Sequence, residues 1–175
     1  LVLLLAAGFS TLEGIILALA TGLVGCSQYG KLKAKQAFKD ANVLYAQQEY
    51  KRAAALYEEA IVQDPELSVA YFYLANSYDN LFKPSRKGEP ENDGYLTKAI
   101  EYYTKASEKE QDPTLRKRSF EFLVAAYGPD KMADPGQAVP IIEEMKNELY
   151  KSAGRLAKRA AAGKLTAAQV RGLSK

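Results

Sequence analysis

Few residues of this 175-residue chain are suited to catalysis. Histidine, the commonest general base and metal ligand, is absent, and cysteine occurs once, as Cys26. The carboxylate pairs Glu58–Glu59 and Glu143–Glu144 fall in helical patterns, where adjacent side chains point about 100° apart and do not share a site. The sequence contains no glycine-rich phosphate loop and no spaced set of metal ligands. We therefore expect no enzymatic activity, no cofactor and no bound metal.

The residue best suited to covalent chemistry is Cys26, which follows an apolar segment, residues 1–25. The letters LVGC at residues 23–26 resemble the lipobox of bacterial lipoproteins. There a diacylglycerol is joined to the thiol and the chain is cut before the cysteine. The resemblance implies that residues 1–25 are a signal peptide and that residues 26–33 are a lipidated cysteine and a linker. Ser27 is not the aspartate that retains such proteins at the inner membrane in enteric bacteria, so the outer membrane is favoured.

A second interpretation keeps residues 1–25 as an uncleaved membrane helix, because about 20 apolar residues span a bilayer. No basic residue precedes the apolar run, although signal peptides begin with one. Glu13 lies within it, where a carboxylate is costly unless protonated or paired. Four lysines between residues 31 and 39 favour a cytoplasmic body if the span is retained. In this interpretation the protein is a structural subunit of an inner-membrane complex.

These terminal features flank a segment with a 34-residue period, which is typical of stacked helix pairs. The residues that recur at this spacing are Phe38 and Phe72, Ala41 and Ala75, and Asn42 and Asn76. Apolar residues three and four positions apart predict a first helix from Ala34, a turn at residues 47–49 and a second helix. The second helix is expected to end at Asp64, because Pro65 disfavours helix in the residue before it.

The residue types within these pairs resemble the tetratricopeptide repeat family. The matching residues are Ala41, Leu44, Tyr50, Ala53, Tyr57, Ala60 and Pro65 in the first repeat; Tyr71, Leu74, Ala75, Tyr78, Ala99, Tyr103, Ala106 and Pro113 in the second; and Phe120, Leu123, Val124, Tyr127, Ala138, Ile142 and Met145 in a looser third.

The resemblance implies an all-α fold and a short solenoid of about three helix pairs, with an N-terminal hydrophobic helix and a C-terminal capping helix. The repeat domain covers residues 34–150, divided into 34–65, 68–113 and 114–150. Asp134–Pro135 suits a helix start, and Pro140 is expected to kink or delay that helix. Arrays of this kind bind other chains and seldom perform chemistry.

The second repeat contains an insertion, residues 83–94, whose two prolines and two glycines predict a loop without helix. Its charges are segregated, and they are Lys83, Arg86 and Lys87, followed by Glu89, Glu91 and Asp93. Two interpretations remain open: a loop that binds a partner, or a solvated loop whose charges pair with one another.

In the family, the first helices of successive repeats line a concave groove. The residues at those positions are Lys35, Phe38, Asn42, Tyr45, Val69, Phe72, Tyr73, Asn76, Arg118, Glu121 and Phe122. Only Asn42 and Arg118 fall where carboxylate-clamping members carry basic or amide groups, so that clamp is not expected. An aromatic wall with amides suits an extended peptide or an amphipathic helix of a protein partner.

The C-terminal segment, residues 151–175, contains seven basic residues and no acid. Its basic face consists of Lys151, Arg155, Lys158 and Arg159. Such a face binds anionic lipid or an acidic partner, or it remains a solvated end helix. No nucleic-acid module is visible, so no nucleic acid is expected. Together these features predict a membrane-anchored scaffold on the periplasmic face of the bacterial envelope, which mediates protein–protein interaction or assembly.

Overall fold

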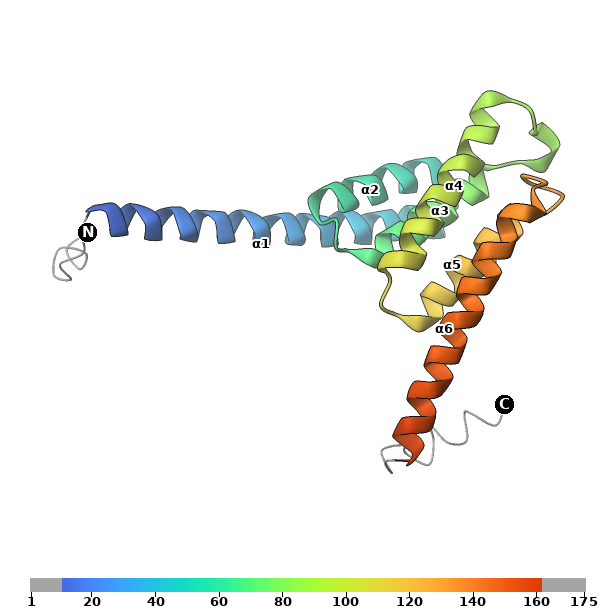
Figure 1. Cartoon of the computed structure of the whole chain (residues 1–175). Coiled ribbons are helices and arrows are strands. Elements are labelled where there is room, and N and C mark those ends of the chain that lie inside the picture. The colour runs from blue at the N-terminus through green and yellow to red at the C-terminus, as the bar shows by residue number, and fades with distance from the viewer. Residues whose placement is uncertain (1–10, 162–175) are drawn as a thin grey trace.

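Six α-helices follow one another along the chain in the computed structural model, which describes residues 11–161 (Figure 1). They are α1 (Thr11–Ala46), α2 (Tyr50–Gln63), α3 (Ser68–Leu81), α4 (Pro90–Lys109), α5 (Pro113–Ala126) and α6 (Pro135–Ala161), with a short 3-10 helix, η1 (Pro84–Arg86), between α3 and α4. Side chains are described from residue 28 onward, except for residues 156, 160 and 161. The predictions for residues 1–10, for residues 162–175 and for the side chain of Cys26 lie outside this range.

The helices pack as sequential antiparallel neighbours, each against the next, and α3 also contacts α5. This confirms the predicted all-α class and an arrangement like that of helical repeats. The first pair is α1 with α2, the second α3 with α4, and the third α5 with α6.

Alanines and tyrosines build most of the core between these helices. The fully buried alanines include Ala41, Ala53, Ala60, Ala75, Ala99 and Ala106. Their small side chains let neighbouring helices approach closely, and the buried rings of Tyr57 and Tyr103 fill the space between layers. The 34-residue period therefore has a packing cause, since Ala41 and Ala75 occupy equivalent buried positions in α1 and α3.

The turns of the first repeat follow the prediction. Gln48 adopts a left-handed conformation (φ 63°), and the Glu49 N–H donates to the Leu44 carbonyl at 2.9 Å, which reverses the chain after α1. Helix α2 ends at Gln63, and the backbone of Asp64 is extended immediately before Pro65.

The predicted linker at residues 26–33 is wrong, because α1 runs through it without a break. The segment contains good helix formers and no proline, and its only residue of low helix propensity past Cys26 is Gly30. A Cβ atom built on Gly30 would lie 3.0 Å from the Gln63 carbonyl oxygen. Glycine at this position therefore lets α1 approach the end of α2.

The predicted loop at residues 83–94 is wrong in its second half, because α4 begins at Pro90. Proline suits the first turn of a helix, and Glu91 and Asp93 in that turn interact favourably with the helix dipole. Residues 84–86 also form a short 3-10 helix, although the glycines and prolines predicted no helix there.

The rest of the insertion is held by internal contacts. The buried side chain of Asn92 accepts from the Lys83 N–H at 2.8 Å and donates to the Lys83 carbonyl at 3.1 Å. Arg86 Nε donates to Glu89 at 2.9 Å, and Glu91 lies 3.6 Å from Lys51 of α2. Arg86, Glu89 and Glu91 therefore have charged partners within the protein.

Helix α6 crosses the predicted boundary at residue 150, and the described range contains no separate capping helix after it. It starts at Pro135 as expected, and Pro140 does not delay it. Pro140 lies near the helix N-terminus, where it removes a single hydrogen bond, the one to the Gly136 carbonyl.

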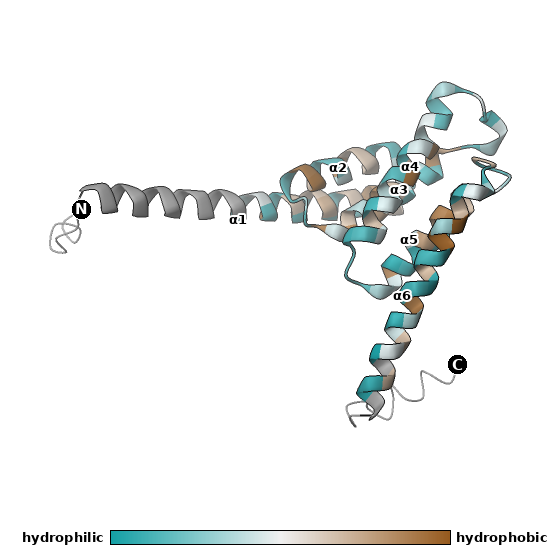
Figure 2. Cartoon of the chain, viewed as in Figure 1, coloured by the Kyte–Doolittle hydropathy of each residue, from teal (hydrophilic) through white to brown (hydrophobic). Residues whose placement is uncertain are grey.

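In Figure 2 the part of α6 near its start is the more hydrophobic, and its C-terminal part is mostly hydrophilic. Among the described residues, no helix is both long and apolar enough to cross a membrane.

The close approach of the helices makes Ala75 a sensitive position. We expect Ala75→Leu to lower the free energy of unfolding by about 1–3 kcal/mol, because a larger side chain must displace helices that are already in contact. Ala55→Leu, on the exposed side of α2, is the matched control and is expected to change it by less than about 0.5 kcal/mol. Urea unfolding of both variants measures the difference, and equal effects would contradict this account of the packing.

Candidate functional site

A groove of about 510 Å³ crosses the first helices of the three pairs. The residues that line it are Tyr45 of α1; Phe72, Tyr73, Asn76, Asp79 and Asn80 of α3; and Arg118 and Phe122 of α5. Six of the residues predicted for the groove therefore lie together around it. Helices α1, α3 and α5 share this face because the second helix of each pair packs on their other side.

Asn76 lies at the centre of the hydrogen-bond network in this groove. Its Oδ1 accepts from Asn80 Nδ2 at 3.0 Å and also from the Tyr45 hydroxyl. Its own Nδ2 donates to the Tyr103 hydroxyl at 3.0 Å. These bonds join α1, α3 and α4 through one amide. The amide orientation is therefore set by three side chains.

Asn42 has the equivalent position in the first repeat, but it does not line the groove. Its Oδ1 accepts from the Tyr57 hydroxyl at 2.7 Å, so it joins α1 to α2 as Asn76 joins α3 to α4. The prediction of Asn42 as a partner contact is therefore replaced by a packing role.

Phe38 also contributes mainly to packing. Its ring centroid lies 5.6 Å from that of Tyr57 and 5.9 Å from that of Tyr73. Lys35 is exposed on α1 and is not among the residues that line the groove, and the same holds for Glu121 on α5. Val69 is half-buried and does not line it either.

The base of the groove is aromatic and belongs to the core. Phe72 lines the groove, but it is only 3% exposed, so little of its ring is available to a partner. Tyr103 stacks on Phe122 with ring centroids 5.0 Å apart, and the Arg118 guanidinium lies over the Phe72 ring at 5.7 Å. The side chains left partly or wholly exposed include Tyr45, Tyr73, Arg118 and Phe122.

Asp79 and Asn80 were missed from the sequence. They follow Asn76 by three and four positions on α3, and this helical spacing was the signal that could have placed them on the same face. Asp79 pairs with Lys131 from the segment between α5 and α6, and both side chains are mostly buried. The groove therefore contains a neutralised carboxylate and an exposed arginine.

The phenol groups near the groove stay protonated at neutral pH. Burial raises the pKa of Tyr103 above its ordinary value of 10, and the Asp79 carboxylate adds to this effect. Burial also raises the pKa of Tyr45, with further contributions from Tyr50 and Tyr73. The Tyr45 hydroxyl therefore remains a hydrogen-bond donor to Asn76, and the Tyr103 hydroxyl accepts from Asn76 while keeping its own proton.

The predicted basic face lies on the exposed surface of α6. Lys151, Arg155, Lys158 and Arg159 are all exposed there, and Lys151 lies 3.0 Å from Glu148. It is well separated in sequence from the groove residues, which come from α1, α3 and α5. The structure does not join the two sites.

A scan against protein-family models finds no match for this chain, and a search of the curated proteins finds none. The assignment of function must therefore rest on the residues and their geometry.

Buried tyrosines also predict how stability depends on pH. Burial raises the pKa of Tyr57, Tyr78 and Tyr103 in the folded chain above the value of 10 expected when unfolded. The contribution of these phenols to the free energy of unfolding is complete below pH 10. It is lost as the pH rises toward their pKa values in the folded chain, because the unfolded chain releases its phenol protons first. We expect the free energy of unfolding to be lower at about pH 11 than at about pH 8.

The variant Tyr103→Phe is expected to reduce that decline, whereas Tyr29→Phe, at an exposed position, is expected to leave it unchanged. Urea unfolding at both pH values measures it. A flat profile in the unmodified chain would contradict the prediction.

Proposed function

We propose that this chain is a tetratricopeptide-type scaffold that binds a segment of another protein in the groove across α1, α3 and α5. The observation that carries the proposal is the groove itself, in which three helices from three successive pairs present aromatic and polar side chains together. Its occupant is an extended peptide or one face of an amphipathic helix.

The chemistry of the groove supports this choice of ligand. Tyr45, Tyr73 and Phe122 offer partly exposed rings that can pack on apolar side chains. Arg118 is exposed and presents guanidinium N–H donors to backbone carbonyls or to a carboxylate. The Asn76 amide is already hydrogen-bonded to three side chains, so it fixes the positions of the helices around the groove. The partly or wholly exposed side chains Tyr45, Tyr73, Arg118 and Phe122 are the ones available to contact a ligand.

We propose that the scaffold is tethered to a bacterial membrane and faces the periplasm, with lipidated Cys26 as the anchor and the outer membrane as the favoured location. Ala34, Ala37 and Ala41, through which α1 packs in the fold, follow Cys26 and would be retained after cleavage. The alternative, an uncleaved N-terminal helix that anchors a subunit of an inner-membrane complex, would use the same α1 without cleavage.

Site-specific photo-crosslinking in cells tests the groove. A photoreactive amino acid at Tyr73 or Arg118 is expected to give a discrete crosslinked product, because both side chains reach the groove surface. The same group at Thr104, exposed on α4, is the matched control and is expected to give none. Equal products at all three positions, or products at Thr104 alone, would contradict the proposed groove.

Intact-mass measurement on the native protein tests the anchor. A chain that starts at Cys26 and carries a diacyl or triacyl increment is the expected result. A mass that includes residues 1–25 would contradict lipidation and support the uncleaved helix. The variant Cys26→Ser is expected to block processing, whereas Ser27→Ala, next to it, is expected to leave it unchanged.

A further inference from the structure

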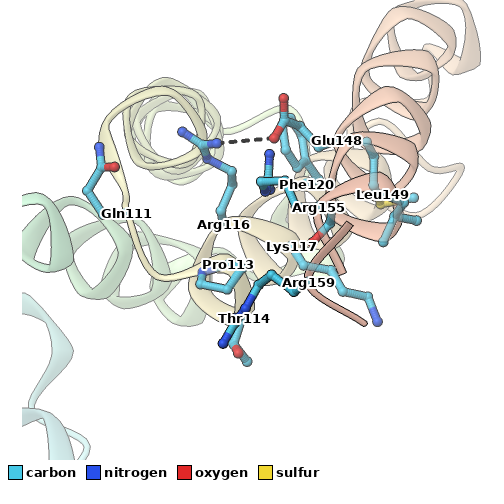
Figure 3. Close-up of a pocket in the computed structure, with 12 residues that line it drawn as sticks. Gln111, Pro113, Thr114, Arg116, Lys117, Phe120, Glu148, Leu149, Arg155 and Arg159 are labelled. Atoms are coloured by element: carbon cyan, nitrogen blue, oxygen red, sulfur yellow. Dashed lines mark hydrogen bonds and ion pairs between the residues drawn. The ribbon is translucent and has the colours of Figure 1, made fainter. Parts of the chain in front are cut away.

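A second cleft, of about 700 Å³, lies between α5 and α6 and shares no residue with the groove (Figure 3). Four cationic side chains line it: Arg116 and Lys117 from α5, and Arg155 and Arg159 from α6. Three apolar residues, Phe120, Met145 and Leu149, lie among them. Arg118 and Phe122, which line the groove, lie on a different face of α5.

The cleft has an excess of positive charge. Glu148 is the carboxylate among its lining residues, and it is already paired with Arg116 at 3.3 Å and with Lys151 at 3.0 Å. Lys151 chiefly, with Arg116 and Arg155, holds the pKa of Glu148 below its usual value, so this carboxylate stays ionised. It offsets one of the four lining cations. Arg155 and Arg159 are both exposed to solvent.

One of these cations also has a donor without an acceptor. Arg116 Nε is buried and has no hydrogen-bond partner among the described residues. This atom is excluded from solvent, so a ligand in the cleft does not reach it. The cations that are open to a ligand are Lys117, Arg155 and Arg159, which are exposed.

The apolar residues show that a bare anion is not the best ligand. Leu149 is 51% exposed, Met145 is half-buried, and the ring of Phe120 is buried behind them. A ligand that covers Leu149 must bring an apolar group along with its negative charge. Two helices wall the cleft, so a narrow chain fits it better than a flat lipid surface. The chain's own residues 162–175 contain three basic residues and no acid, so their charge does not complement the cleft.

We propose that the α5–α6 cleft binds an acidic segment of a partner protein in which an apolar side chain is flanked by carboxylates. The carboxylates pair with Arg155, Arg159 and Lys117, and the apolar side chain packs on Leu149 and Met145. The scaffold therefore has two binding sites on different faces of α5, with different ligand chemistry.

Fluorescence anisotropy of the full chain with a fluorescein-labelled peptide of sequence EELEELEE tests the proposal. Arg155→Glu is expected to raise Kd by about tenfold or more, because it places a carboxylate against those of the peptide. Lys158→Glu makes the same change in charge on the same helix, outside the cleft lining, and is expected to raise Kd by less than about threefold.

A second pair of variants tests the apolar contact without changing charge. Leu149→Ser is expected to weaken binding of the peptide, and Tyr150→Ser, its exposed neighbour outside the lining, is expected to leave it nearly unchanged. All four positions are exposed, so circular dichroism should show unchanged helicity.

Four results would overturn the proposal. The first is the absence of saturable peptide binding, and the second is an equal loss in Arg155→Glu and Lys158→Glu, which would mean attraction by net charge alone. The third is loss of peptide binding in Arg118→Glu with none in Arg155→Glu, which would place the peptide in the groove. Binding of phosphatidylglycerol vesicles that depends on Arg155, without peptide binding, would identify a lipid surface as the ligand and also overturn it.

Discussion

The close contact of helix backbones at buried alanines is the constraint from which the remaining structure follows. Ala41, Ala53, Ala75 and Ala99 are wholly excluded from solvent, each on a different helix. Where a side chain is this small, two helices can approach until larger neighbours interlock around the contact. The tyrosines do this here, and their hydroxyls are then buried and need partners. Asn42 and Asn76 provide those partners in successive pairs, so one packing solution is used twice.

Stacking of equivalent pairs has two consequences for binding. It aligns α1, α3 and α5 so that their free sides form a shared groove, with Asn76 fixing the geometry at its centre. It also leaves the last helix, α6, without a following pair among the described residues. Its outer side chains, including Val139, Ile142 and Tyr150, therefore remain exposed. The cleft against α5 is a feature of this terminal pair, and its ligand chemistry need not resemble that of the groove.

The errors made from the sequence share a physical origin. Proline and glycine were taken as breakers at residues 83–94 and at Pro140. Proline in the first turn of a helix costs little, because the first N–H groups have no partner within the helix. Pro90 and Pro135 accordingly begin helices. Pro140 lies deeper, and α6 continues through it with the loss of one hydrogen bond. Asn42 was assigned to the groove, and Phe72 to an accessible position in it, by register alone. Register specifies the face of a helix but not the depth of a side chain, which depends on how far the neighbouring helix covers it.

The sequence by itself determined the helical class, the period, the turn at residues 47–49 and the end of the second helix before Pro65, because these follow from local spacing and from the size of side chains at repeated positions. Only the tertiary structure decided which of those side chains are available. In the folded chain Phe72 is buried, the Asn76 amide is hydrogen-bonded to neighbouring side chains, and Asp79 and Asn80 line the groove. It also brought Arg116 and Lys117 beside Arg155 and Arg159, which are remote in sequence, to form the cleft. The reason is that a site between helices depends on their relative placement, which no local pattern encodes.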